Sequence, residues 1–300
     1  MRAGQKCTIT SVCSWDQKIM VLSVKEKVRE EVKVLLLERA LELLGQIRDT
    51  SPISSRNTSK GALVKETYIL FRAVDAGLSV SAVRQSILET GIIQKTSYET
   101  RRRIWDAIKH RYLSVHPEWV AQSLADASRL GAESSEYLSL AYLYFVLRDR
   151  LVFSIVTELI WGKWRQQTTT ISRGDIVQLL EKMAEDHPQI KQWRESTRLR
   201  LASSILAALR DFGLLRGIQK KHIQRPLVAS TTVLHLLYIL LSEGLEGRKI
   251  LEAPDWRLFL WTEVDVARAL GELAQQQWIR FEKSGSIVIL ELKRLPEAIA

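Results

Sequence analysis

The residues of this chain best suited to chemistry are cations, beginning with three consecutive arginines. Arg101, Arg102 and Arg103 stand in the stretch TSYETRRRIWDAIKHRYL, residues 96–113, and Lys109 follows them. Guanidinium and ammonium groups bind phosphate and carboxylate oxygens through charge-assisted hydrogen bonds. Cations in a first helical turn oppose the helix dipole by about 0.3–1 kcal/mol each, so helix stability does not explain them. An anionic partner explains them, and so does a solvated charged face.

A second set of cations lies in the third quarter of the chain. Residues 163–230 hold 13 Lys and Arg against 6 Asp and Glu, so they carry +7 (13 − 6) of a total of +10. This excess favours nucleic acid, anionic lipid or an acidic protein as a partner. The candidate phosphate contacts in this quarter share a helix face or a predicted hairpin: Arg194, Arg198, Lys220, Lys221 and Arg225.

The arginine run is placed by a predicted amphipathic helix that begins near Ser97. Thr96 and Glu99 have the spacing of a capping box at its start. Apolar residues then recur at helical spacing, which gives the helix one stripe to bury: Ile104, Trp105, Ile108 and Tyr112. Helical patterns at 62–77 and 79–91 precede it, so the order is that of a helix-turn-helix unit, and of any three-helix bundle.

The second set of cations is placed by a helix followed by a hairpin. A helix is expected from Gln192 to Gly213, and the next 15 residues, LLRGIQKKHIQRPLV, predict two short strands around a basic turn. The last quarter repeats this order, with a helix capped by Thr262 and Asp265 and then WIRFEKSGSIVILEL. Helix followed by hairpin is how a winged-helix unit ends. Only the first copy is basic, because residues 231–300 carry 8 cations and 10 carboxylates, and we expect the second copy to pack or to bind protein.

These patterns predict a mainly α fold: helical bundles with helix-turn-helix or winged-helix-like units and short β-hairpins. We expect four parts. Residues 1–60 form an N-terminal helical appendage and linker, 61–150 a helix-turn-helix-like helical domain, 151–230 a basic winged-helix-like domain, and 231–300 a winged-helix-like subdomain of helix and β-hairpin.

Catalytic and cofactor signatures are missing from the sequence. It has no Gly-rich phosphate loop, no GxSxG and no metal-ligand cluster, so we expect no enzyme activity, cofactor or metal. Cys7 and Cys13 are expected to be reduced thiols, and His235, inside VLHLLYILL, a core residue. The apolar runs are too short or too interrupted by charge to span a bilayer, and no signal peptide is recognisable. We therefore predict a cytoplasmic protein that does not bind membranes.

Two helical patterns carry a resemblance to a known family. The first is S-x-x-T-x-R-R-I, matched from Ser97 to Ile104, and the second is W-x-x-S-T-x-x-(K/R)-L, matched from Trp193 to Leu201 and including Arg200. Over residues 58–292 the chain resembles BrxA, a protein of BREX phage-defence systems. Its first 50 or so residues depart from the family; they are either an added contact arm or, if Met20 is the start, upstream sequence.

The resemblance implies a helical, non-enzymatic member of a multi-protein system that methylates host DNA and blocks phage replication. It also implies a fold similar to that of the RNA-binding antitermination protein NusB. Together with the basic elements it predicts an accessory subunit that binds double-stranded DNA through the phosphate backbone and works with other BREX proteins. The alternatives are a scaffold whose basic face docks another defence subunit, and an RNA binder. Binding of single-stranded RNA is less favoured, because most aromatic residues lie in apolar runs and are not available for stacking.

Overall fold

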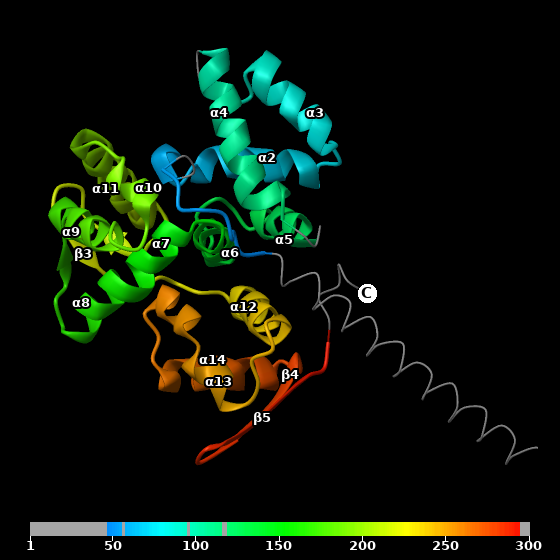
Figure 1. The fold of residues 1–300 in the computed structure, drawn as a ribbon. Coiled ribbons are helices and arrows are strands. Elements are labelled where there is room, and N and C mark those ends of the chain that lie inside the picture. Colours follow the sequence, from blue (N-terminus) through cyan, green and yellow to red (C-terminus); the bar gives the residue numbers. More distant parts are fainter. Residues whose placement is uncertain (1–46, 56–57, 95–96, 116–118, 295–300) are drawn as a thin grey trace, which may run out of the picture.

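The computed structural model describes residues 47–55, 58–94, 97–115 and 119–294, and the chain is mainly α-helical (Figure 1), as predicted. Most of the predicted N-terminal appendage, both cysteines and Thr96 lie outside the described residues. The elements, in chain order, are η1 (Thr58–Lys60), α2 (Val64–Asp75), α3 (Val80–Gln85), η2 (Ser86–Thr90), α4 (Tyr98–Ile108), η3 (Lys109–Leu113), α5 (Trp119–Ser128), α6 (Ser135–Leu147), α7 (Arg150–Ser154), η4 (Ile155–Ile160), α8 (Trp161–Arg165), β1 (Thr170–Ile171), α9 (Arg173–Met183), α10 (Pro188–Lys191), α11 (Glu195–Asp211), β2 (Leu215–Arg216), β3 (Lys221–Ile223), α12 (Ser230–Ser242), α13 (Arg248–Glu252), η5 (Pro254–Phe259), α14 (Glu263–Gln275), β4 (Ile279–Ser284) and β5 (Ile287–Leu292).

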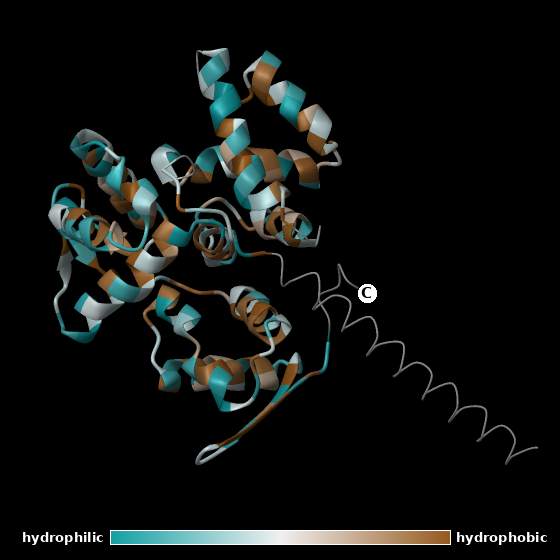
Figure 2. Cartoon of the chain, viewed as in Figure 1, coloured by the Kyte–Doolittle hydropathy of each residue, from teal (hydrophilic) through white to brown (hydrophobic). Residues whose placement is uncertain are grey.

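Helix α4 carries the arginine run, and its start differs by one residue from the prediction. Ser97 is the N-cap, and its hydroxyl accepts a hydrogen bond from the amide of Thr100 at 3.2 Å. The predicted stripe is confirmed, since all four of its residues are buried. The visible side of α4 is mostly hydrophilic (Figure 2), so the charged residues are left on the surface away from the core.

Helix α6 forms the centre of the molecule. Every residue from Ser139 to Leu147 is buried, as expected for an apolar helix covered on all sides. Helix α5 and the π-helical segment η3 cover one part of it, and α7 and α12 cover others. Its neighbours therefore come from three of the four predicted parts of the chain.

The basic quarter contains three small strands and the helices α9, α10 and α11. Strand β1 pairs antiparallel with β3, and β3 pairs antiparallel with β2, so the sheet order is β1-β3-β2. The capping box of Ser172 and Asp175 starts α9. The helix expected from Gln192 is α11, which begins three residues later, at Glu195, and a separate short helix, α10, ends before it at Lys191.

The last quarter has the helix and hairpin that the sequence predicts. Thr262 and Asp265 form a capping box at the start of α14. Strands β4 and β5 pair antiparallel from Ile279 opposite Leu292 to Ser284 opposite Ile287. The hairpin projects beyond the body of the molecule (Figure 1).

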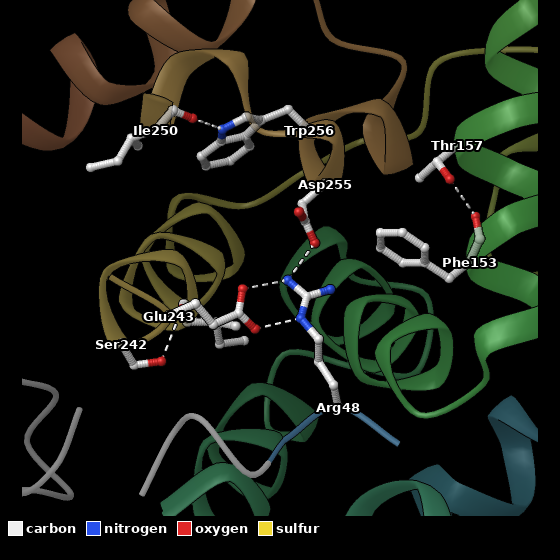
Figure 3. A network of polar contacts seen from close by, with 9 residues as sticks. Arg48, Phe153, Thr157, Ser242, Glu243, Ile250, Asp255 and Trp256 are labelled. Carbon is white, nitrogen blue, oxygen red and sulfur yellow. Dashed lines mark hydrogen bonds and ion pairs between the residues drawn. The ribbon is translucent and has the colours of Figure 1, made fainter. Parts of the chain in front are cut away.

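The described residues 47–55 and 58–60, which we call the strap, lie against the body of the protein. The amide of Asp49 donates to the carbonyl of Leu147 at 3.3 Å, and Arg148 donates to the carbonyl of Ile47 at 2.9 Å. The guanidinium of Arg48 binds both oxygens of Glu243 and, at 2.8 Å, the carboxylate of Asp255 (Figure 3). The strap thus ties α6 to the C-terminal quarter.

Arg48 tests this connection. Arg48→Ala leaves Asp255, whose side chain is 6% exposed, without its counter-ion. We expect the free energy of unfolding, measured by urea denaturation, to fall by about 2 kcal/mol, because an unpaired buried carboxylate is costly.

The control is a double-mutant cycle with Asp255→Asn. In that background Arg48→Ala should lower the free energy of unfolding by about 1 kcal/mol less, because the amide carries no charge that would be left without a counter-ion. Equal costs in the two backgrounds would show that the two residues are not coupled.

His235 is a core residue, as expected. Its Nδ1 lies 2.7 Å from the hydroxyl of Tyr144, and the ring of Trp119 packs edge-on against it with centroids 4.8 Å apart. Burial lowers the pKa of His235 to about 3 from its ordinary 6.5. The folded protein therefore keeps this imidazole neutral at pH values where the unfolded chain protonates it.

This difference predicts a pH dependence of stability. Between pH 6.5 and 3 the unfolded state binds a proton that the folded state does not, so stability contributed by neutral His235 is lost as the pH falls. We expect a contribution of about 1.4 kcal/mol per pH unit to the free energy of unfolding over this window. Urea denaturation from pH 4 to 7 measures the slope, which should be smaller in His235→Gln; an unchanged slope would contradict the assignment.

Candidate nucleic-acid interface

The three arginines of α4 point to different surroundings. Arg101 donates through Nε and Nη2 to the carbonyl of Leu88, at 3.0 and 2.8 Å, and so holds the end of η2. Arg102 and Arg103 share the carboxylate of Glu99, at 3.4 and 2.8 Å. Both of these side chains are more than half exposed. Arg101 therefore has a structural role. We infer that it is not a phosphate contact.

Lys109 does not share the surroundings of the other cations of this element. It lies at the start of η3 and is exposed. Arg102 and Arg103 line a cavity between α4 and the strap, and Lys109 does not belong to its lining. The α4 cations thus do not form one flat surface.

Arg194 and Arg198 were expected to share a helix face. Arg194 instead occupies the N-cap position of α11 with extended backbone, and its side chain makes no capping hydrogen bond. It is exposed, whereas Arg198 is half-buried and donates to the carbonyl of Ile190 at 3.2 Å. Leu199, on the same helix, is 38% exposed. Arg194 remains a candidate contact, and Arg198 joins α11 to α10.

The hairpin presents one of its three predicted cations outward without a partner. Lys220 is exposed, but Lys221 is buried and its ammonium donates to the carbonyl of Gly217 at 2.7 Å. Burial, together with nearby Arg210, lowers the pKa of Lys221. Gly217 has a φ of +91°, and a Cβ there would lie 2.2 Å from the carbonyl oxygen of Lys220, so this tight turn requires glycine.

Arg225 also makes a structural contact. Its guanidinium binds Asp265 in a bidentate pair, at 3.0 and 2.9 Å, and lies over the ring of Trp164 at 5.9 Å. Asp265 is at the same time the capping residue of α14, so this pair joins the basic quarter to the C-terminal one. The hydrogen bonds from Thr262 and Arg225 outweigh the effect of burial and lower the pKa of Asp265. We therefore also exclude Lys221 and Arg225 from the proposed contacts.

A hollow of about 1060 Å³, which we call the basic hollow, gathers cations that sequence reasoning missed. It lies between the start of α9, one face of α11 and the hairpin. Arg173, the first residue of α9, lines it and is exposed, and so does Lys220. Arg200 is exposed seven residues before Ala207, a lining residue, and so shares its helix face.

The electrostatics of the basic hollow favour an anion. The N-terminus of α9 adds a partial positive charge to the side chains that surround it. Asp175 is the carboxylate in the lining, and it is paired with Lys163 at 2.7 Å. Burial by itself would raise the pKa of Asp175, but the hydrogen bonds from Lys163 and Ser172 outweigh it and lower the pKa.

Two signals in the sequence pointed toward the missed cations. Arg200 belongs to the second family pattern, and Arg173 directly follows the N-cap of a capping box. The sequence does not indicate that α9 and the hairpin lie close together in the fold.

Within the described residues, no helix is long and apolar enough to span a bilayer.

Known structures include one with a similar fold. The crystal structure of an uncharacterized protein from Magnetospirillum magneticum aligns with 70% of this chain and 100% of its own, at a TM-score of 0.53 and 14% sequence identity. At this identity the likeness concerns the fold alone. A comparison with curated proteins gives no match. The family model of BrxA matches residues 52–238, which is more than half of the sequence. The chain therefore belongs to the BrxA family.

Proposed function

We propose that this protein is a non-enzymatic subunit of a BREX-type phage-defence system that binds double-stranded DNA through its phosphate backbone. Membership of the BrxA family supports the BREX association. The basic hollow is the observation that carries the DNA proposal, because it brings exposed Arg173 of α9 and exposed Lys220 of the hairpin to one face with half-buried Arg210 of α11. Other predicted cations are held by contacts within the protein: Arg101, Arg198, Lys221 and Arg225.

The order of elements in the basic quarter supports a winged-helix unit. Helix α8 is followed by β1, α9, α10, α11, β2 and β3, and the strand order is β1-β3-β2. In such a unit α11 takes the place of the recognition helix and the turn between β2 and β3 that of the wing. Both elements border the basic hollow. A duplex lying against α11 would then meet Arg200 on the helix and Lys220 on the wing.

The proposed contacts position DNA without reading its sequence. Arg173, Arg194, Arg200 and Lys220 are exposed and suited to phosphate oxygens. Two Ser residues on the same side of α11, Ser203 and Ser204, are half-buried and small. We therefore expect backbone binding with little sequence preference, in which Arg102, Arg103 and Lys109 play at most a secondary part.

The two alternatives predict different behaviour. A scaffold would use the same cations to dock an acidic subunit, and its DNA binding would be weak. An RNA binder that acts on single strands needs exposed aromatic rings for stacking, whereas Tyr142, Tyr144 and Phe145 are buried. Burial of these rings supports duplex over single-stranded ligands.

A charge-removal variant tests the DNA proposal. In Arg173→Gln/Arg200→Gln/Lys220→Gln, we expect weaker binding of duplex DNA and a slope of log K against log salt that is shallower by about 1 for each cation lost. Fluorescence anisotropy at several salt concentrations measures both quantities, with duplex RNA and single strands as comparison ligands.

The matched control removes three cations elsewhere. Lys65, Arg84 and Lys249 are exposed, and their replacement by Gln makes the same change in net charge. This control should keep the wild-type slope. Equal losses in the two triple variants would point to non-specific attraction by net charge, and the proposal of a DNA surface at the basic hollow would then be wrong.

A further inference from the structure

A second cavity lies outside the proposed DNA surface, between α4 and the strap. It has a volume of about 630 Å³, and the start of α7 supplies a further part of its lining. We call it the strap cavity. Its size falls in the range of small-molecule sites. Besides Arg148, four cations of three different elements line it: Lys60, Arg102, Arg103 and Arg150.

Three of the carboxylates in the strap cavity already have partners. Asp49 pairs with His110 at 3.3 Å and accepts a hydrogen bond from the amide of Ser51 at 2.9 Å. Asp149 is buried and accepts hydrogen bonds from the hydroxyl of Thr58 and from two backbone amides of α7. Glu99 is the carboxylate shared by the two arginines. The remaining one, Asp106, is exposed.

The charges of the cavity do not balance. Burial by itself would raise the pKa of Asp49, but hydrogen bonds from Ser51 and attraction to His110 and Arg148 outweigh it and lower the pKa. Burial raises the pKa of Asp149, and nearby Arg111 opposes the rise. With Arg148 counted against Asp49, and Arg111, which lies outside the lining, counted against Asp149, four cations face two carboxylates, Glu99 and Asp106, and leave a net charge of +2 (4 − 2). The contacts of Arg102 and Arg103 with Glu99 run through Nε, and both side chains are more than half exposed, so a ligand can reach their guanidinium groups.

We propose that the strap cavity binds a phosphorylated small molecule that carries at least two negative charges, such as a diphosphate or triphosphate. Two neighbouring guanidinium groups suit adjacent phosphate groups, because each can donate two parallel hydrogen bonds. Arg150 and Lys60 face the same space from α7 and the strap. This site is separate from the basic hollow, and the proposal does not depend on DNA binding.

The lining offers few contacts to the part of the ligand that carries no phosphate, so that part should add little to the affinity. Pro52, Ile53 and Ala107 are the apolar residues among the described residues of the lining, and it contains no Phe, Tyr or Trp. The imidazole of His110 is the one aromatic ring among these described lining residues, and it is paired with Asp49. A nucleobase would therefore find little to stack on. The phosphate groups should determine affinity, and triphosphate with or without a nucleoside should bind to a similar extent.

The test is isothermal titration calorimetry of the full chain with pyrophosphate, tripolyphosphate and ATP. We expect binding of all three to the wild type, and binding that is weaker by about tenfold or more in Arg102→Gln/Arg103→Gln. The pairs with Glu99 are solvent-exposed, so their loss should leave the fold intact. Asp106→Asn removes the carboxylate that opposes the ligand and should bind tripolyphosphate more tightly than the wild type.

Two controls separate this site from the DNA surface. The variant Arg173→Gln/Arg200→Gln/Lys220→Gln should bind tripolyphosphate as the wild type does, and duplex DNA should not displace it. No binding to the wild type at millimolar tripolyphosphate, or equal binding in Arg102→Gln/Arg103→Gln, would overturn the proposal. Displacement by duplex DNA would assign the four cations to the nucleic-acid surface and would overturn it as well. The first two results do not bear on DNA binding at the basic hollow.

Discussion

The buried carboxylate of Asp149 is the interaction on which the arrangement of this protein depends. One oxygen accepts hydrogen bonds from the amides of Leu151 and Val152, at 3.1 and 3.2 Å, and so caps the start of α7. The other accepts a hydrogen bond from the hydroxyl of Thr58 in the strap. Burial raises the pKa of Asp149, and these hydrogen bonds with nearby Arg111 oppose the rise. Arg111 is itself fully buried and donates to the carbonyl of Ala62 at 3.1 Å. Charged groups are retained at such depth only when hydrogen bonds and opposite charges compensate their desolvation. The strap, the turn before α7 and the end of the α4–η3 helix are therefore fixed relative to one another.

The strap connects the contacts of Asp149 to the C-terminal quarter. Thr58 holds it to Asp149, and ten residues earlier Arg48 holds it to Glu243 and Asp255 in the C-terminal quarter. The same segment forms one side of the strap cavity. A ligand that binds Arg102 and Arg103 across the cavity would draw α4 and the strap together and stabilise contacts that extend to the C-terminal quarter. Occupancy of the cavity and the position of the C-terminal quarter are thus joined through one continuous stretch of backbone.

Most of the fold could be predicted from the sequence, because its elements follow local rules. The capping boxes of Ser172 and Thr262 depend on residues three positions apart, and the stripe of α4 depends on helical periodicity. The fate of each cation could not be predicted in the same way. Arg225 binds a carboxylate 40 residues away, and Arg48 binds two that are 195 and 207 residues away. Lysine and arginine have the same local pattern whether they meet solvent or a distant partner, so the sequence indicates a basic region but not which of its cations are held by contacts within the protein.

The two anion sites differ in a physical property that follows from their shape. The basic hollow is broad and is bordered by exposed side chains, so a bound duplex would remain next to water and mobile ions. Its binding should weaken steeply with salt, because counterions released from DNA return at high ionic strength. The strap cavity is smaller, about 630 Å³, and accommodates a ligand with few phosphate groups. A small phosphate ligand there exchanges few counterions and binds through hydrogen bonds of fixed geometry. Salt should therefore weaken the first interaction far more than the second, even though both use the same two kinds of side chain.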